Sequence, residues 1–226
     1  MRHLLSALSV VGLLASPQPP SQEPGTITGS VKLTSRVRGN PLATAAYAPR
    51  AVGDYRPPPT PEIQNVLVYL KDRDGHAHTA GLPQAREIVQ RHEAFVPRVL
   101  AVTTGSTVSF PNDDNLYHNV FSLSAAATFD LGRFPKGQSR SRQFKRPGLV
   151  KVYCQIHSQM SASILVLNHS YFTVPSQEGR FQIADVPAGR HTVVGWHERV
   201  GERSVTVDVP AGSAAAVELS LPVDTP

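Results

Sequence analysis

Short apolar runs separated by frequent turn residues are the feature that most restricts the fold of this chain. Its 226 residues include 20 prolines and 16 glycines, many of which fall between short segments rich in Val, Ile, Thr and Phe. Proline and glycine at this density interrupt helices but suit the turns between strands. No segment carries a convincing helical repeat over three turns. The sequence therefore predicts an all-β fold in which helix is scarce.

Strands are predicted wherever apolar residues alternate with polar ones or form a short continuous run. The stretch from Gly25 to Leu33 alternates with a period of two. The stretch from Val66 to Leu70 is apolar throughout, which is typical of a strand buried on both faces. Further strands are predicted over residues 87–92, 99–103, 107–110, 119–123, 139–144, 150–153, 164–167, 171–174, 180–183, 191–196, 204–209 and 215–221.

The N-terminus has the pattern of a secretory signal peptide. Arg2 and His3 form a short basic region, and residues 4–15 are a mostly apolar stretch that is too short to cross a bilayer as a helix. The prolines that follow at once argue against a buried N-terminal helix. We expect residues 1–15 to be a signal peptide and residues 16–24 a linker. The mature protein is then expected to be soluble and periplasmic or secreted.

Cys154 is the only cysteine of the chain. In an exported protein a single cysteine is an inert buried thiol, a thiol that pairs between molecules, or a metal ligand. It opens the loop Cys154-Gln155-Ile156-His157-Ser158-Gln159-Met160 between two predicted strands, and His118 lies upstream at the start of another strand.

These residue types point to copper. Two imidazoles, one thiolate and a weakly bound thioether are the donor set of electron-transfer copper sites. Ligands three positions apart in a tight loop can converge on one ion. The sequence therefore predicts one mononuclear copper site, with His118, Cys154 and His157 as strong ligands and Met160 as the weak axial ligand. The competing interpretation is a buried cysteine with incidental histidine and methionine nearby.

The segment that carries these residues resembles the cupredoxins. The spacing of Cys154, His157 and Met160 is similar to that of amicyanin-type loops, and residues 102–112 resemble the strand–turn–strand before the first histidine ligand. The resemblance covers about residues 84–168. It implies a Greek-key sandwich with one type 1 blue-copper ion that alternates between Cu(I) and Cu(II).

The resemblance also assigns a supporting role and marks two departures. In cupredoxins the residue after the first histidine ligand is commonly an asparagine that ties the two ligand loops together, and here it is Asn119. Gln155 stands where the family usually has Thr or Ser, and Ile156 where it usually has Pro. Both departures lie beside the thiolate, where hydrogen bonding to sulfur affects the reduction potential.

The C-terminal part resembles a second family, the carboxypeptidase regulatory-like β-sandwiches. Residues 178–193 look like its repeated hairpin, and the stretch from Gly25 to Val31 has the Gly-x-Ile-x-Gly-x-Val form of its first strand. Because residues 169–226 alone hold few strands for a sandwich, we expect a discontinuous domain of residues 25–74 plus 169–222. The cupredoxin domain, residues 84–168, would be inserted between its halves. The alternative is two sequential domains, in which 169–226 folds alone.

Two further groups of polar residues have several interpretations. His76 and His78 form a His-x-His pair that could bind a metal, but a solvated turn is favoured because no third ligand lies close in sequence. The net charge is +5, and one acid-free run carries Arg133, Lys136, Arg140, Arg142, Lys145 and Arg146. This basic run is either a docking face for an acidic redox partner or a solvated strand face, and the second is favoured.

The pattern as a whole favours an electron carrier over an enzyme. A closed four-ligand copper site leaves no open position for a substrate, and no Ser-His-Asp, zincin, P-loop or Rossmann motif is present. The expected partner is a soluble or membrane-attached redox protein. Neither nucleic-acid binding nor stable membrane insertion is expected. The alternatives are a copper carrier or sensor, in which the ion is cargo, and a structural β-sandwich that mediates interactions.

Overall fold

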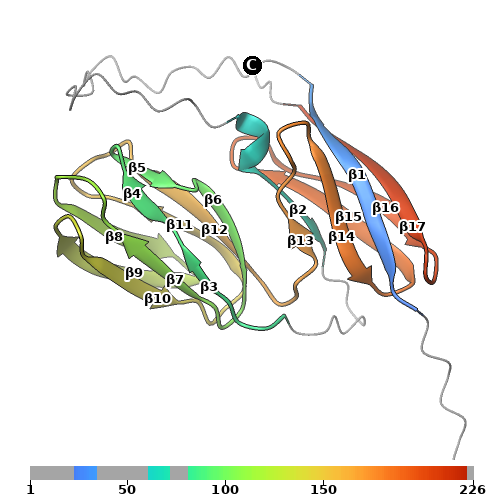
Figure 1. The fold of residues 1–226 in the computed structure, drawn as a ribbon, viewed down its shortest axis with the longest axis horizontal. Coiled ribbons are helices and arrows are strands. Elements are labelled where there is room, and N and C mark those ends of the chain that lie inside the picture. Colours follow the sequence, from blue (N-terminus) through green and yellow to red (C-terminus); the bar gives the residue numbers. More distant parts are fainter. Residues whose placement is uncertain (1–22, 35–60, 72–80, 223–226) are drawn as a thin grey trace, which may run out of the picture.

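A computed structural model describes residues 23–34, 61–71 and 81–222 (Figure 1). Within these ranges the chain forms strands, one 3-10 turn at Glu62–Asn65 and no α-helix, so the predicted all-β class is confirmed. The described residues contain no helix that is long and apolar enough to span a membrane. Three predicted features lie outside the described residues: the signal peptide, most of the linker, and the His76 and His78 pair.

The strands fall in the following order. They are β1 (Gly25–Leu33), β2 (Val66–Leu70), β3 (Ala85–Glu87), β4 (Val89–Arg91), β5 (Ala94–Val96), β6 (Val99–Thr103), β7 (Thr107–Pro111), β8 (His118–Ser124), β9 (Ala127–Phe134), β10 (Ser139–Gln143), β11 (Gly148–Tyr153), β12 (Ser161–Leu167), β13 (Phe172–Thr173), β14 (Arg180–Val186), β15 (Gly189–His197), β16 (Gly201–Val209) and β17 (Ala214–Leu221).

Four sheets are stacked as two sandwiches that lie side by side (Figure 1). The first sandwich packs the sheet β10-β7-β3 against the sheet β6-β12-β11-β8-β9 around one apolar core. The second packs the sheet β14-β1-β17 against the sheet β13-β2-β15-β16 around another. The short hairpin β4-β5 completes the first sandwich and contributes Phe95 to its core.

A third apolar cluster, which we call the seam, joins the two sandwiches. It contains side chains of β2 and β15 from the second sandwich and of β6 and β12 from the first: Leu67, Tyr69, Val99, Ala101, Leu165, Leu167, Val194 and Trp196. Successive side chains of a strand point to opposite faces. Strand β2 therefore sends Val66, Val68 and Leu70 into its own core and Leu67 and Tyr69 into the seam. This explains why all five of its residues are buried.

Strands β1 and β2 are each central in a sheet whose other strands come from the C-terminal part of the chain. Strand β1 pairs antiparallel with β14 and parallel with β17. Strand β2 pairs antiparallel with both β13 and β15. Residues near positions 30 and 70 thus lie beside residues after position 170, while the division of the chain into separately folding domains stays a prediction.

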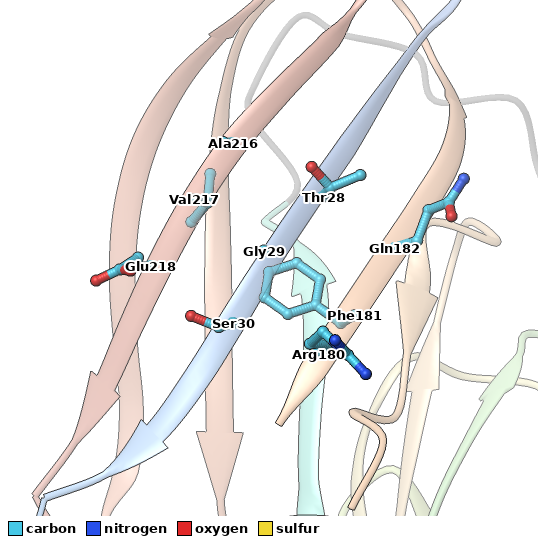
Figure 2. A pocket seen from close by; sticks show the side chains of 9 residues that line it. All are labelled: Thr28, Gly29, Ser30, Arg180, Phe181, Gln182, Ala216, Val217 and Glu218. Atoms are coloured by element: carbon cyan, nitrogen blue, oxygen red, sulfur yellow. The ribbon is translucent and has the colours of Figure 1, made fainter. Parts of the chain in front are cut away.

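Gly29 shows why glycine is required within β1. A Cβ atom at this position would lie 2.2 Å from the carbonyl oxygen of Val217 and 2.6 Å from the ring of Phe181. The Phe181 ring lies beside Gly29 (Figure 2). Any other residue at position 29 would displace that ring, so this glycine of the Gly-x-Ile-x-Gly-x-Val pattern permits a close approach across the sheet.

The predicted strands differ from the observed ones mainly around two segments. The predicted strand over residues 87–92 is two short strands, β3 and β4, separated at the buried Ile88. Strands β5 and β9 were not expected. Strand β9 is an edge strand with a largely exposed or half-buried pattern and a left-handed glycine, Gly132, at φ 68°. Such a strand lacks the apolar alternation on which the prediction depends.

Candidate metal centre

The predicted ligands meet at one end of the first sandwich. Strand β8 begins at His118 and strand β11 ends at Tyr153, directly before Cys154. The two strands are antiparallel neighbours, so the start of one lies beside the end of the other. Strand β12 begins at Ser161, directly after the loop, and runs back along β11. Both ends of the loop that carries Cys154 and His157 are therefore fixed by strands.

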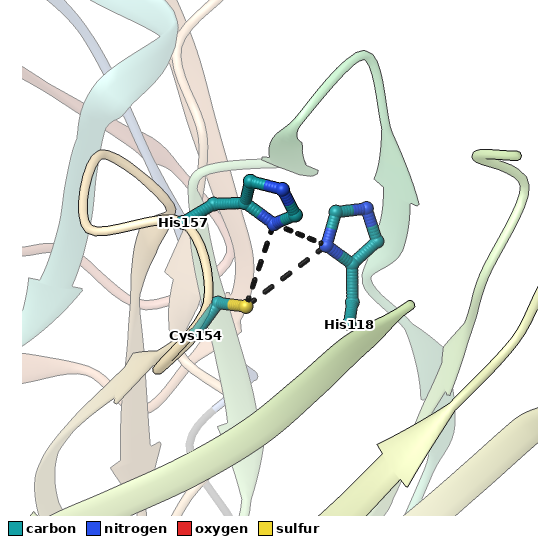
Figure 3. Close-up of side chains that lie close together, drawn as sticks. All are labelled: His118, Cys154 and His157. Atoms are coloured by element: carbon teal, nitrogen blue, oxygen red, sulfur yellow. Dashed lines mark hydrogen bonds between the residues drawn. The ribbon is translucent and has the colours of Figure 1, made fainter. Parts of the chain in front are cut away.

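Three donor atoms converge at this end, namely Nδ1 of His118, Nδ1 of His157 and Sγ of Cys154 (Figure 3). The two nitrogens are 2.9 Å apart, and each lies 3.9 Å from the sulfur. Two unprotonated imidazole nitrogens at this separation would direct lone pairs at each other, so the arrangement requires a proton or a cation between them.

The size of this triangle fits a metal ion. The product of its three sides divided by four times its area gives a circumradius of about 2.1 Å, which lies within the usual range of about 2.0–2.3 Å for metal bonds to imidazole nitrogen and thiolate sulfur. The point equidistant from the three donors is thus at bonding distance from all of them. Two imidazoles and one thiolate around one point form the trigonal donor set that suits copper.

Hydrogen bonds hold the loop closed around the donors. The Cys154 N–H donates to the Met160 carbonyl over 3.2 Å, and the Met160 N–H donates to the His157 carbonyl over 3.0 Å. The Asn119 side chain accepts the Gln155 N–H over 2.7 Å. Asn119 follows His118 in β8, so this bond ties the histidine strand to the cysteine loop.

Met160 is the last residue of the loop, and its side chain is buried in the apolar core. Its side chain is 1% exposed and belongs to the same core cluster as Cys154. The backbone bonds of Met160 to Cys154 and His157 keep it close to both residues. Its assignment as the axial ligand stays a prediction.

The Cys154 sulfur sits in a polar surround that favours its thiolate. Burial raises the pKa of the thiol, but the hydrogen bond from His118 and the backbone N–H groups of Asn119, His157 and Ile156 lower it to about 6. Cupredoxins usually have a proline at the position of Ile156, and proline has no N–H. Ile156 therefore adds a hydrogen-bond donor near the sulfur.

Each histidine of the triangle also has a carboxylate behind it. His118 Nε2 lies 2.8 Å from the Asp114 carboxylate, and His157 Nε2 lies 3.9 Å from that of Glu93. Burial lowers the pKa of His118, but its contacts with Cys154 and Asp114 outweigh burial and raise it. Burial raises the pKa of Asp114, but the N–H groups of Glu93 and His92 and the His118 ring outweigh burial and lower it.

These two carboxylates were not among the predicted site residues. Asp114 lies four positions before His118, so its proximity could have been suspected from spacing. Glu93 lies in the turn between β4 and β5, far from the ligands in sequence. Only the packing of that turn against the ligand loops brings Glu93 to His157.

The basic run lies on β9, β10 and the segments around them. The guanidinium of Arg140 lies 5.3 Å from the centre of the Phe134 ring, and that of Arg142 lies 5.5 Å from the Phe129 ring. All five residues of β10 are exposed. Both arginines therefore cover aromatic rings of their own sandwich, which gives them a packing role whether or not a partner binds this face.

Several solved structures are similar to part of the chain. A copper-containing nitrite reductase from Thermus scotoductus is 24% identical and covers 42% of this chain and 24% of its own, with a TM-score of 0.35. A purple cupredoxin from Nitrosopumilus maritimus is 22% identical and covers 36% of this chain and 98% of its own, with a TM-score of 0.33. An amicyanin from Paracoccus versutus is 20% identical and covers 36% of this chain and 80% of its own, with a TM-score of 0.34.

These structural neighbours are cupredoxins, at low identity and over less than half of this chain. The similar part spans about a quarter of the nitrite reductase. No protein-family profile and no curated protein matches the chain. The resemblance of the C-terminal part to carboxypeptidase regulatory-like sandwiches stays a prediction.

Proposed function

We propose that this protein is an exported type 1 copper protein that transfers single electrons through one mononuclear site. The proposed strong ligands are His118, Cys154 and His157, with Met160 as the axial ligand and Asn119 as a support. The observation that carries the proposal is the donor triangle, because its atom types and its size both fit a copper ion.

The surroundings of the donors suit electron transfer. Bound copper would supply a one-electron Cu(I)/Cu(II) couple. The chain's own part is to keep the three donors in place in both oxidation states, and the loop bonds from Cys154 to Met160 and from Gln155 to Asn119 restrict their movement. Fixed donors keep the rearrangement on electron transfer small.

His157 is the proposed route for the electron. Its side chain is 17% exposed, whereas that of His118 is 0% exposed. Ile156 and Tyr117, one in each ligand loop, are 41% and 60% exposed. These apolar groups would let a partner protein approach the His157 edge closely. The proposed partner is a redox protein, and a partner with an acidic face would suit the basic run. The proposed role is not enzymatic.

Adding Cu(II) to the purified mature protein tests the function. We expect one equivalent to produce an intense thiolate-to-copper charge-transfer band in the visible spectrum and a small copper hyperfine splitting. Reversible bleaching and recovery of this band in a redox titration would support electron transfer. A colourless complex with ordinary tetragonal Cu(II) parameters would rule out the blue-copper proposal.

Competition with a chelator and repeated redox cycling of the copper-loaded protein separate the alternatives. A copper carrier or sensor would surrender its ion readily to a competing chelator, whereas an electron carrier would retain copper through repeated oxidation and reduction. A structural sandwich would bind no copper at this site. We also expect no enzymatic activity. If the copper site is closed to substrates, added substrate analogues should leave the copper spectrum unchanged.

Replacing Met160 by glutamine tests the axial ligand. A thioether is a soft donor that favours Cu(I), whereas an amide oxygen is harder and favours Cu(II). Met160→Gln should therefore keep the charge-transfer band, shift the spectrum toward a more tetragonal site and lower the reduction potential. Each ~60 mV of shift corresponds to about 1.4 kcal/mol for a one-electron couple.

Met160→Leu is the matched control for packing. Leucine fills a similar volume in the core but offers no donor. Loss of an axial thioether should alter both the potential and the spectrum. A potential that responds to neither substitution would remove Met160 from the ligands and leave a three-coordinate site.

A further inference from the structure

The carboxylate of Asp114 is held directly behind the ligand His118. Its Oδ2 lies 2.8 Å from His118 Nε2, the nitrogen that points away from Cys154. The His118 side chain is fully buried and that of Asp114 is 12% exposed, so solvent screens this contact weakly. A carboxylate acceptor keeps a proton on Nε2, so Nδ1, which faces the sulfur and His157, is the nitrogen that could bind a metal.

The turn between β4 and β5 fixes the same carboxylate from the other side. The N–H of His92 donates to Asp114 Oδ1 over 2.6 Å, and the N–H of Glu93 donates to Oδ2 over 2.8 Å. Both turn residues have positive φ, 54° and 53°, which suits a two-residue hairpin turn but is uncommon for residues other than glycine, asparagine or aspartate. The two hydrogen bonds to Asp114 offset part of that cost.

The backbone around Asp114 is also anchored. Its own N–H donates to the Asn112 side chain over 2.9 Å. The Asn112 amide in turn donates to the carbonyls of Leu116 and Phe134 over 2.8 and 3.0 Å. Asp114 is thus the meeting point of the β4-β5 turn, the loop before β8 and the ligand His118.

Glu93 brings a second carboxylate to the other imidazole. Its Oε2 accepts a hydrogen bond from the Gln159 side chain over 2.9 Å and lies 3.9 Å from His157 Nε2. Glu93 is thus held by the ligand loop itself. The β4-β5 turn therefore carries one carboxylate, Glu93, and holds the other, Asp114, so negative charge lies near the outer nitrogens of both histidines.

We propose that Asp114 is a positioning residue that sets the reduction potential of the site, with Glu93 adding a smaller effect of the same sign. This inference rests on the proposed copper function. A thiolate and two neutral imidazoles leave one net positive charge around Cu(II) and none around Cu(I). A carboxylate hydrogen-bonded to a ligand imidazole makes that ligand a stronger donor and stabilises the more positive state. Asp114 therefore favours Cu(II) and lowers the potential.

Asp114→Asn tests this role, with Asp113→Asn as the matched control. Both substitutions remove one negative charge from adjacent positions. Asp113 pairs with Arg91 instead of a proposed ligand, and its side chain is 44% exposed. In Asp114→Asn we expect Cu(II) affinity to fall about 10-fold or more, with a smaller loss for Cu(I). A 10-fold change in the ratio of the two affinities raises the potential by about 59 mV. Asp113→Asn should shift it much less.

The outcomes distinguish this inference from the function on which it rests. No charge-transfer band in the wild type overturns the proposed function and this inference with it. A wild-type band combined with equal potentials in the Asp113→Asn and Asp114→Asn proteins overturns this inference alone. If Asp114→Asn fails to hold copper, NMR of the diamagnetic wild-type Cu(I) protein decides. A slowly exchanging Nε2 proton on His118 supports the carboxylate contact, and rapid exchange overturns it.

Discussion

Cys154→Ser should abolish the thiolate-to-copper charge-transfer band completely while leaving the β-sheet circular dichroism in place. The band requires electron donation from a thiolate sulfur, and a serine hydroxyl does not ionise near neutral pH to replace it. Cys154 is 4% exposed, so the new hydroxyl is buried beside His118, at a cost to stability of at most about 3 kcal/mol. Visible absorption after addition of Cu(II) measures the loss.

Ala162→Ser provides the matched control for this substitution. Ala162 is 2% exposed and belongs to the same apolar core cluster, so the change also introduces a hydroxyl into that core. The band should survive in this variant. Persistence of the band in Cys154→Ser would mean that another group is the chromophore, and the proposed site would have to be abandoned.

Residues 169–222 produced alone should not fold cooperatively. Strands β14 and β17 both pair with β1, and β13 and β15 both pair with β2. Without β1 and β2, the one described strand pair left within residues 169–222 is the hairpin β15-β16. A single two-stranded hairpin is marginal in water. Far-UV circular dichroism and the dispersion of amide NMR signals would report the absence of a fixed fold.

The missing core side chains give the size of the effect. The absent strands supply Ile27, Val31, Val66, Val68 and Leu70 to the core of the second sandwich, each at most 4% exposed. At about 1.5–3 kcal/mol for each buried aliphatic side chain, their loss removes roughly 7–15 kcal/mol. That loss is of the same size as the whole stability of a typical domain, about 5–15 kcal/mol.

A chain in which residue 71 is joined to residue 169 by a short glycine linker is the control. It deletes the intervening segment but keeps β1 and β2. The Leu70 N–H donates to the Tyr171 carbonyl over 3.0 Å, so the two ends to be joined are adjacent. We propose that residues 25–74 and 169–222 form one discontinuous domain, and on this basis the joined chain should unfold cooperatively. Cooperative unfolding of residues 169–222 alone would instead favour two sequential domains.

The fold class and the order of most strands could be predicted because a buried β-strand has a recognisable local sequence, either alternating or continuously apolar. Strand β1 and strand β2 have the bounds that their alternation and apolar content predicted. Strand β9 was missed because an edge strand with a left-handed glycine carries little alternation. Periodicity reports how many faces of a strand are covered, but it contains nothing about which strand covers each face.

The seam is the clearest case of this limit. The sequence of β2 indicates burial on both faces. In the structure, one face meets β14, β1 and β17, and the other meets β6 and β12. This arrangement depends on contacts between segments that are far apart in the chain. The same holds for Trp196, because its neighbours in the seam include Val99 and Leu165, which belong to the other sandwich.

The metal centre divides in the same way. Cys154, His157 and Met160 lie within one loop, so the sequence by itself determined which donor types are available, and their combination predicts copper. Only the tertiary structure decided that Nδ1 of His118 lies 2.9 Å from Nδ1 of His157, and that Asp114 and Glu93 stand behind the two rings. Donor chemistry is a property of individual side chains, so it can be read from the sequence. Distances of a few ångströms between residues 93, 118 and 157 follow from strand register and sheet packing, which the chain specifies only when it folds.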